Sequence, residues 1–178
     1  MLALSGDQLG ELANFYGSVG QTLSPAWVWA SSFLFLIIIL LFLVGFARFM
    51  GYGPFVGLIG ALYISYALYS AFPYQAYLPS APALTAIAAH LALYFGFFVL
   101  SYLLLRRVAA SDFIHIGTIG LLLISLSTAG FIMALAYQSF TVQTVYHFSP
   151  QLDLLFANKE WFYAWFVAPV ITLFVFAN

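Results

Sequence analysis

A long apolar run extends from residue 26 to residue 48, where Arg48 ends it. Within residues 26–47 the only hydroxyl groups belong to Ser31 and Ser32. A helix of this length is roughly 33 Å long at about 1.5 Å per residue, and the hydrocarbon core of a bilayer is about 30 Å thick. The pattern therefore predicts a helix that spans a membrane.

Four more apolar runs follow, separated by charged residues, prolines and turn-forming residues. Gly51, Gly53 and Pro54 precede the second run, a sequence typical of a tight turn into a new helix. The last run is short, roughly 24 Å of helix, and contains Pro169. We expect it to cross the membrane, with a re-entrant or interfacial segment as the alternative. The predicted spans cover residues 26–48, 55–72, 83–105, 114–137 and 161–176.

Two further segments have the pattern of helices that lie on a membrane surface. Residues 1–24 repeat apolar positions at three- and four-residue steps, which predicts an interfacial amphipathic helix. In the connection 138–160, Ser149 and Pro150 resemble an N-cap and a first helical residue, and an apolar stripe follows. The predicted fold is all-α: a polytopic bundle of four or five transmembrane helices in one domain, 25–178, with an interfacial helix before it.

The composition supports a polytopic membrane protein. The 178 residues are 65% apolar, 20% aromatic and 5% charged, against about 25% charged residues in an ordinary soluble domain. The net charge of −1, without a basic cluster, argues against nucleic acid as a partner and against a polybasic patch for lipid headgroups. The lack of cysteine excludes thiol redox chemistry, disulfides and thiolate metal sites on this chain. Asp7 and Glu11 stand where a signal peptide has basic residues, so none is expected.

The arginines predict an orientation in the membrane. Arg48 ends the first span, and Arg106 and Arg107 end the third, so two crossings place all three on one face. Lys159 lies on the other face. By the positive-inside rule the arginine face is cytoplasmic, with the N-terminus and the segment 138–160 outside the cell membrane. The short helix within that segment is then extracytoplasmic.

His90 is the most suggestive side chain for chemistry, because it lies within the third span. Tyr94 follows one helical turn later and extends a thin polar stripe. An ionisable group inside a membrane is a functional hypothesis by default. The alternative is a neutral histidine that bonds to a tyrosine of the second span or a hydroxyl of the fourth, and holds the helices together.

Two rows of side chains recur along the second span. The tyrosine row lies at three-residue steps and consists of Tyr63, Tyr66 and Tyr69. It is compatible with a polar path or a headgroup groove, although helix packing and interface anchoring are the commoner roles. The row of small residues lies at four-residue steps and consists of Gly57, Ala61 and Ser65. We expect it to form an internal helix contact in preference to a homodimer seam.

The spans contain no Asp or Glu, so the usual carboxylate proton relay is absent. No hydrolase, metalloprotease or phosphate-loop motif occurs. His147 has no second ligand at metal-binding spacing, and Asp112, near Arg106, Arg107 and His115, is expected to lie in a solvated loop. The sequence therefore predicts no catalytic site, cofactor or metal.

The junction between the first two spans resembles the colicin V production protein family, CvpA. Members tend to end the first helix with a Gly-Phe-x-Arg turn and to place a glycine early in the second. Gly45, Phe46 and Arg48 match that turn, and Gly57 matches the later glycine. The linker before the fourth span lacks the arginines that the family carries there. The resemblance implies a bacterial inner-membrane protein with a role in secretion, the envelope or biofilms, and leaves its molecular activity open.

Three functional hypotheses remain. The first is a non-enzymatic scaffold or assembly component whose partners are the lipid bilayer, other membrane proteins or further copies of the chain. The second is a channel or passive transporter lined by His90, Tyr94 and the tyrosines of the second span. The third is a lipid-modifying enzyme, for which the sequence offers no nucleophile, acid or metal site.

Overall fold

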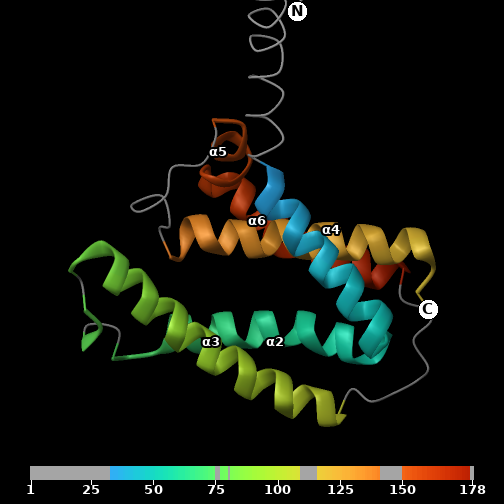
Figure 1. The fold of residues 1–178 in the computed structure, drawn as a ribbon, viewed down its shortest axis with the longest axis horizontal. Helices are drawn as coiled ribbons and strands as arrows, with labels where there is room; N and C mark the ends of the chain where they lie inside the picture. The colour runs from blue at the N-terminus through green and yellow to red at the C-terminus, as the bar shows by residue number, and fades with distance from the viewer. Residues whose placement is uncertain (1–32, 75–76, 80, 109–115, 141–149, 177–178) are drawn as a thin grey trace, which may run out of the picture.

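The computed structural model describes residues 33–74, 77–79, 81–108, 116–140 and 150–176. These residues are largely helical and contain no strand, and five of their helices are long and apolar enough to cross a membrane (Figure 1). Those five are Phe33–Met50 (the first helix), α2 (Tyr52–Ala71), α3 (Ala83–Val108), α4 (Thr118–Gln138) and α6 (Lys159–Phe176). The short helix α5 (Pro150–Phe156) precedes α6. The predicted all-α bundle of spanning helices is confirmed.

The turn between the first helix and α2 is tighter than predicted, because α2 begins at Tyr52 and not at residue 55. Gly51 has φ 95°, a left-handed conformation that glycine adopts without steric cost. Its N–H donates to the carbonyl of Ala47 (3.1 Å), and its carbonyl accepts from Phe55 N–H (3.3 Å). Pro54 lies in the first turn of α2, where its missing N–H has no helical acceptor to lose. One glycine therefore closes one helix and opens the next.

The other helix ends differ from the predicted spans by a few residues. α3 continues three residues past residue 105, to Val108. α4 begins at Thr118, four residues after the predicted start, with Gly117 as its N-cap. α6 begins at Lys159, because Asn158 Oδ1 accepts a hydrogen bond from Glu160 N–H (3.1 Å) and caps the helix. This cap lengthens the last apolar helix to 18 residues, against the 16 expected.

Several predicted features lie outside the described residues. These are the interfacial helix 1–24, the start of the first span, and the side chains Asp112, His115 and His147. The predicted short helix before the last span is present as α5, and it begins at Pro150 as expected.

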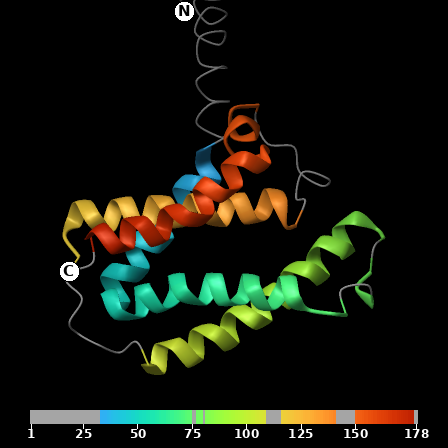
Figure 2. The same ribbon diagram turned by 180° about the vertical axis from the view of Figure 1, so that it is seen from behind.

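The helices pack closely as two antiparallel pairs, α2 with α3 and α4 with α6. In the first pair, Tyr69 near the end of α2 meets His90 of α3, and Gly60 lies near Leu105 further along. In the second pair, Gly130 of α4 lies against Trp165 of α6. Figure 2 shows α4 and α6 side by side above α2, with α3 crossing below.

A layer of aromatic rings fills the space between the two pairs. Tyr63 of α2 stacks on Phe131 of α4 with ring centroids 4.8 Å apart, and meets Phe166 of α6 edge-on at 5.0 Å. Phe140, just after α4, contacts Tyr69 of α2 at 5.4 Å. The layer comprises Tyr63, Tyr66, Tyr69, Tyr94, Phe131, Phe140, Phe162 and Phe166. The pairs are therefore joined by large side chains while their backbones stay apart.

The first helix ties the pairs together. It crosses α4 obliquely before it turns into α2 (Figure 1). Near its start, Phe33 and Leu36 pack against the cluster that surrounds Met133 and Tyr137. Near its end, Leu43 and Ala47 are buried in the main core. The first helix therefore contacts α4, which belongs to one pair, near its start, and it reaches α2, which belongs to the other pair, at its end.

All three arginines lie at one end of the bundle. The rings of Phe46 and Tyr102 meet edge-on with centroids 6.1 Å apart, so the last turns of the first helix and of α3 are neighbours. The three arginines follow these rings within about one helical turn, Arg48 after Phe46 and the other two, Arg106 and Arg107, after Tyr102. All three are exposed. α4, the most buried of the five long helices in the described residues, runs between this end and the opposite one.

Candidate functional site

The intramembrane histidine pairs with a tyrosine of α2. The Tyr69 hydroxyl lies 2.9 Å from His90 Nδ1, and the two rings are nearly perpendicular with centroids 6.1 Å apart. His90 is half-buried on α3, and Tyr69 is buried in the last turns of α2. A hydroxyl can donate to Nδ1 or accept from it, so either neutral tautomer satisfies this contact. The contact joins two spanning helices in the way the packing interpretation of His90 describes.

Tyr94 completes a small polar cluster with this pair. Its hydroxyl donates to the carbonyl of Leu62 (3.1 Å), and its ring lies edge-on to Tyr69 at 6.1 Å. Phe140 closes the cluster, with its ring 5.4 Å from Tyr69 and 5.2 Å from Tyr94. The sequence predicted that His90 and Tyr94 lie on one stripe of the same helix. Nothing in the sequence indicated that Phe140, which follows α4 and is remote in the chain, would contact them. The cluster therefore combines three elements at one end of the bundle.

The three tyrosines of α2 do not share one partner. The Tyr63 hydroxyl donates to the carbonyl of Phe166 in α6, close to Pro169. Pro169 lacks the N–H that would bond to the carbonyl of Trp165, so the Tyr63 bond is made to the carbonyl next to this break in α6. Tyr66 makes ring contacts with Phe162 and Phe166, and the Tyr69 hydroxyl contacts His90. The row is thus divided between α6 and α3.

The small residues of α2 are internal. Gly57, Ala61 and Ser65 are all buried, and Ala61 and Ser65 have no exposed surface. Ser65 Oγ bonds to the carbonyls of Ala61 and Leu62 (2.7 and 2.9 Å) on the preceding turn. The row therefore faces the interior of one chain.

A second small-residue contact, between α4 and α6, was missed by sequence reasoning. A Cβ at Gly130 would overlap the ring of Trp165, and a Cβ at Gly120 would lie 2.8 Å from Cβ of Phe176. Between these points Ser127 Oγ lies 2.9 Å from Thr172 Oγ1. The glycines in the fourth span were a visible signal, but their partners on α6 were not.

The residues that carry the CvpA resemblance have differing surroundings. A Cβ at Gly45 would meet no atom within 4 Å, so packing among the described residues does not require glycine there. Phe46 lies against Tyr102, and Arg48 is exposed. Gly57 is buried in α2.

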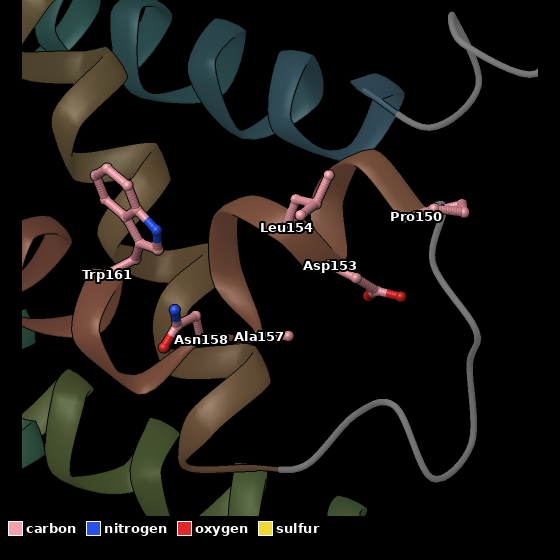
Figure 3. Close-up of a pocket in the computed structure, with 6 residues that line it drawn as sticks. All are labelled: Pro150, Asp153, Leu154, Ala157, Asn158 and Trp161. Atoms are coloured by element: carbon pink, nitrogen blue, oxygen red, sulfur yellow. The ribbon is translucent and has the colours of Figure 1, made fainter.

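A hollow of about 560 Å³ opens beside α5, at the turn into α6 (Figure 3). In Figure 3 the side chains of Asp153 and Asn158 project from neighbouring turns of chain. Tyr137 of α4 lies beside Asp153. The hollow is lined by Pro150, Asp153, Leu154, Ala157, Asn158 and Trp161. Sequence reasoning did not single out this group.

The chemistry available to the described residues is limited. Among them, no group of three or more His, Asp or Glu side chains is placed to hold a metal ion. The polar groups of the helices mostly contact other helices or their own backbone. Comparison with known proteins found no family model, no curated protein and no solved structure that matches the chain.

Proposed function

We propose that this chain is a small, non-enzymatic membrane protein that serves as a scaffold or assembly component of the cell envelope. One observation carries the proposal: the polar side chains of the spans are used to join helices. Tyr63 reaches α6, Tyr69 meets His90, and Tyr94 reaches α2. Side chains used in this way build a stable bundle, and they leave apolar outer surfaces for lipid or for other membrane helices.

The outer face of α3 is one such surface. Among its described side chains only Tyr94 and Ser101 are buried. Large apolar side chains cover the rest of the helix and are exposed at Leu84, Leu91, Phe95, Leu100, Leu103 and Leu104. Lipid tails can cover this face, and so can a helix of another membrane protein, because both are equally apolar.

The proposal also includes an orientation of the chain in the membrane and a relationship to a protein family. Three exposed arginines at one end of the bundle support a cytoplasmic position for that end, by the positive-inside rule. The segment that contains α5 then lies outside. A bacterial inner-membrane protein related to the CvpA family fits this arrangement, through the turn at Gly45, Phe46 and Arg48 and the buried Gly57.

Purification of the full chain from its own membranes tests the scaffold proposal. In mild detergent we expect a stoichiometric partner or a homo-oligomer to copurify. A clean monomer under conditions that keep known membrane complexes intact contradicts the proposal.

Liposome flux tests the channel hypothesis. The double variant His90→Ala, Tyr94→Phe removes two of the side chains assigned to a lining, while Leu84→Ala on the exposed face of α3 is a matched control. We expect no flux of ions or small solutes from the wild type. Flux that the double variant alters and the control leaves unchanged would replace the scaffold proposal with a channel.

A further inference from the structure

A row of five aromatic rings joins the first helix to α3. Phe42 and Phe46 lie on the first helix with ring centroids 6.3 Å apart, and Phe46 meets Tyr102 of α3 edge-on at 6.1 Å. The row continues along α3, where Tyr102 stacks on Phe98 at 6.2 Å and Phe98 contacts Phe95 at 6.1 Å. Phe42 and Phe95 are exposed, at 64% and 63%, and the three rings between them are half-buried. This aromatic seam is therefore open to the lipid tails around the spanning helices.

The three arginines follow the middle of this seam, toward one end of the bundle. Arg48 comes two residues after Phe46, about 3 Å further along the first helix. Arg106 comes four residues after Tyr102, about 6 Å further along α3, so it lies on the same face one turn nearer the helix end. Arg107 follows it, and all three side chains are exposed. Because charged residues at the ends of spans lie at the membrane surface, these guanidinium groups stand at the level of the lipid headgroups.

The carboxylates of the described residues lie at the other end of the bundle. They are Asp153 of α5 and Glu160 of α6. That end is the one where Gln138, the last residue of α4, donates from its side-chain amide to the carbonyl of Ala157 (2.7 Å). Within the described part of the chain, the arginine end therefore has positive charge without a carboxylate beside it.

We propose that an anionic phospholipid binds in the aromatic seam, with its phosphate on the arginines of the first helix and α3 and an acyl chain along the rings. A guanidinium group matches a phosphate through paired N–H donors, and basic sites between spanning helices bind anionic headgroups. Three arginines are fewer than the about four to eight basic residues of a polybasic membrane-binding segment. The rings therefore supply the rest of the affinity, through the apolar surface that they bury against the acyl chain.

Charge and polarity together select this occupant. A zwitterionic headgroup would place an ammonium group near the arginines, and like charges repel. A soluble phosphate would leave the exposed rings uncovered, whereas a lipid covers the rings and neutralises the arginines at once. The inference rests on the spanning helices and the position of the arginines, and it requires neither the scaffold role nor a cytoplasmic location of this end.

Competitive lipid retention tests the charge requirement. The full chain in a maltoside detergent is mixed with phosphatidylglycerol and phosphatidylcholine of identical acyl chains, and retained lipid is counted by native mass spectrometry. We expect the wild type to retain phosphatidylglycerol in preference to phosphatidylcholine. Arg106→Gln lowers that preference by about tenfold or more, the scale of a lost charge-assisted contact. Lys159→Gln removes the same charge from an exposed position at the other end of the bundle and leaves the preference unchanged.

A second pair of variants tests the aromatic seam. Phe42→Ala removes an exposed ring of the seam and is expected to lower the retention of phosphatidylglycerol several-fold. Phe174→Ala removes a ring of α6 that is 85% exposed and leaves retention unchanged.

Four results would overturn the proposal. The first is equal retention of the two lipids by the wild type. The second is an equal effect of Arg106→Gln and Lys159→Gln, and the third is an equal effect of Phe42→Ala and Phe174→Ala. The fourth is displacement of the lipid by glycerol 3-phosphate as readily as by intact phosphatidylglycerol, which would assign the arginines to a soluble phosphate. Monodisperse elution shows that each variant is folded. If Arg106→Gln fails that check, Arg48→Gln decides, because it is expected to lower the same preference and an unchanged preference refutes the site.

Discussion

Gly130 is the position where a single added methyl group tests the packing of α4 against α6 most directly. A Cβ there would overlap the ring of Trp165. The ring has little freedom to move, because Trp165 Nε1 donates to the carbonyl of Leu155 (3.1 Å) and the ring contacts Phe156 with centroids 5.2 Å apart. Gly130→Ala must therefore separate the two helices or break the contacts of Trp165 with α5.

The size of the effect follows from two opposing terms. Overpacking a well-packed interior costs typically about 1–3 kcal/mol. Replacing glycine by alanine within a helix stabilises the helix by up to about 1 kcal/mol, because alanine has the higher helix propensity. The net loss is about 1–2 kcal/mol, because the rigid ring prevents a cheap adjustment. For a chain of this size that loss lowers Tm by roughly 2–8 °C.

Thermal unfolding in detergent measures this loss, and two comparisons identify its cause. Gly96→Ala is the matched control, because a Cβ at Gly96 on α3 would meet no atom within 4 Å. It should leave Tm unchanged or raise it slightly. In the background of Trp165→Leu, Gly130→Ala should cost much less, since the obstructing ring is gone. Equal Tm values for Gly130→Ala and Gly96→Ala would refute the close contact between α4 and α6.

Three further predictions concern the polar contacts and the orientation. A double-mutant cycle of Tyr69→Phe and His90→Ala should show a coupling of about 0.6–1 kcal/mol in unfolding free energy, the usual size for a hydrogen bond between membrane helices; additive effects would mean that the pair does not interact. Tyr63→Phe removes a bond to an α6 carbonyl and should lower Tm by a few degrees without changing helix content, as measured by circular dichroism. An impermeant maleimide should label Leu154→Cys but not Phe49→Cys in intact cells, since these exposed positions lie at opposite ends of the bundle and the chain has no native cysteine; the reverse pattern would contradict the proposed orientation.

The spanning helices could be predicted well because membrane insertion depends on local composition. A run of apolar residues as long as the bilayer is thick identifies a span wherever it occurs, whatever it packs against. The helix ends were less accurate where they depend on caps. Asn158 extends α6 to Lys159, and Gly117 delays the start of α4. Each is a short-range feature that hydropathy alone does not report.

The sequence by itself predicted an all-α chain with four or five helices able to span a membrane, and it marked His90 as an unusual residue within one of them. The described residues contain five such helices. Only the tertiary structure decided which residues meet: Tyr69 with His90, Gly130 with Trp165, and α5 with the end of α4. The physical reason is that lipid is as apolar as a protein interior. A helix that is apolar all round gives no periodic signal of its inward face, so its partners emerge only when the helices are packed together.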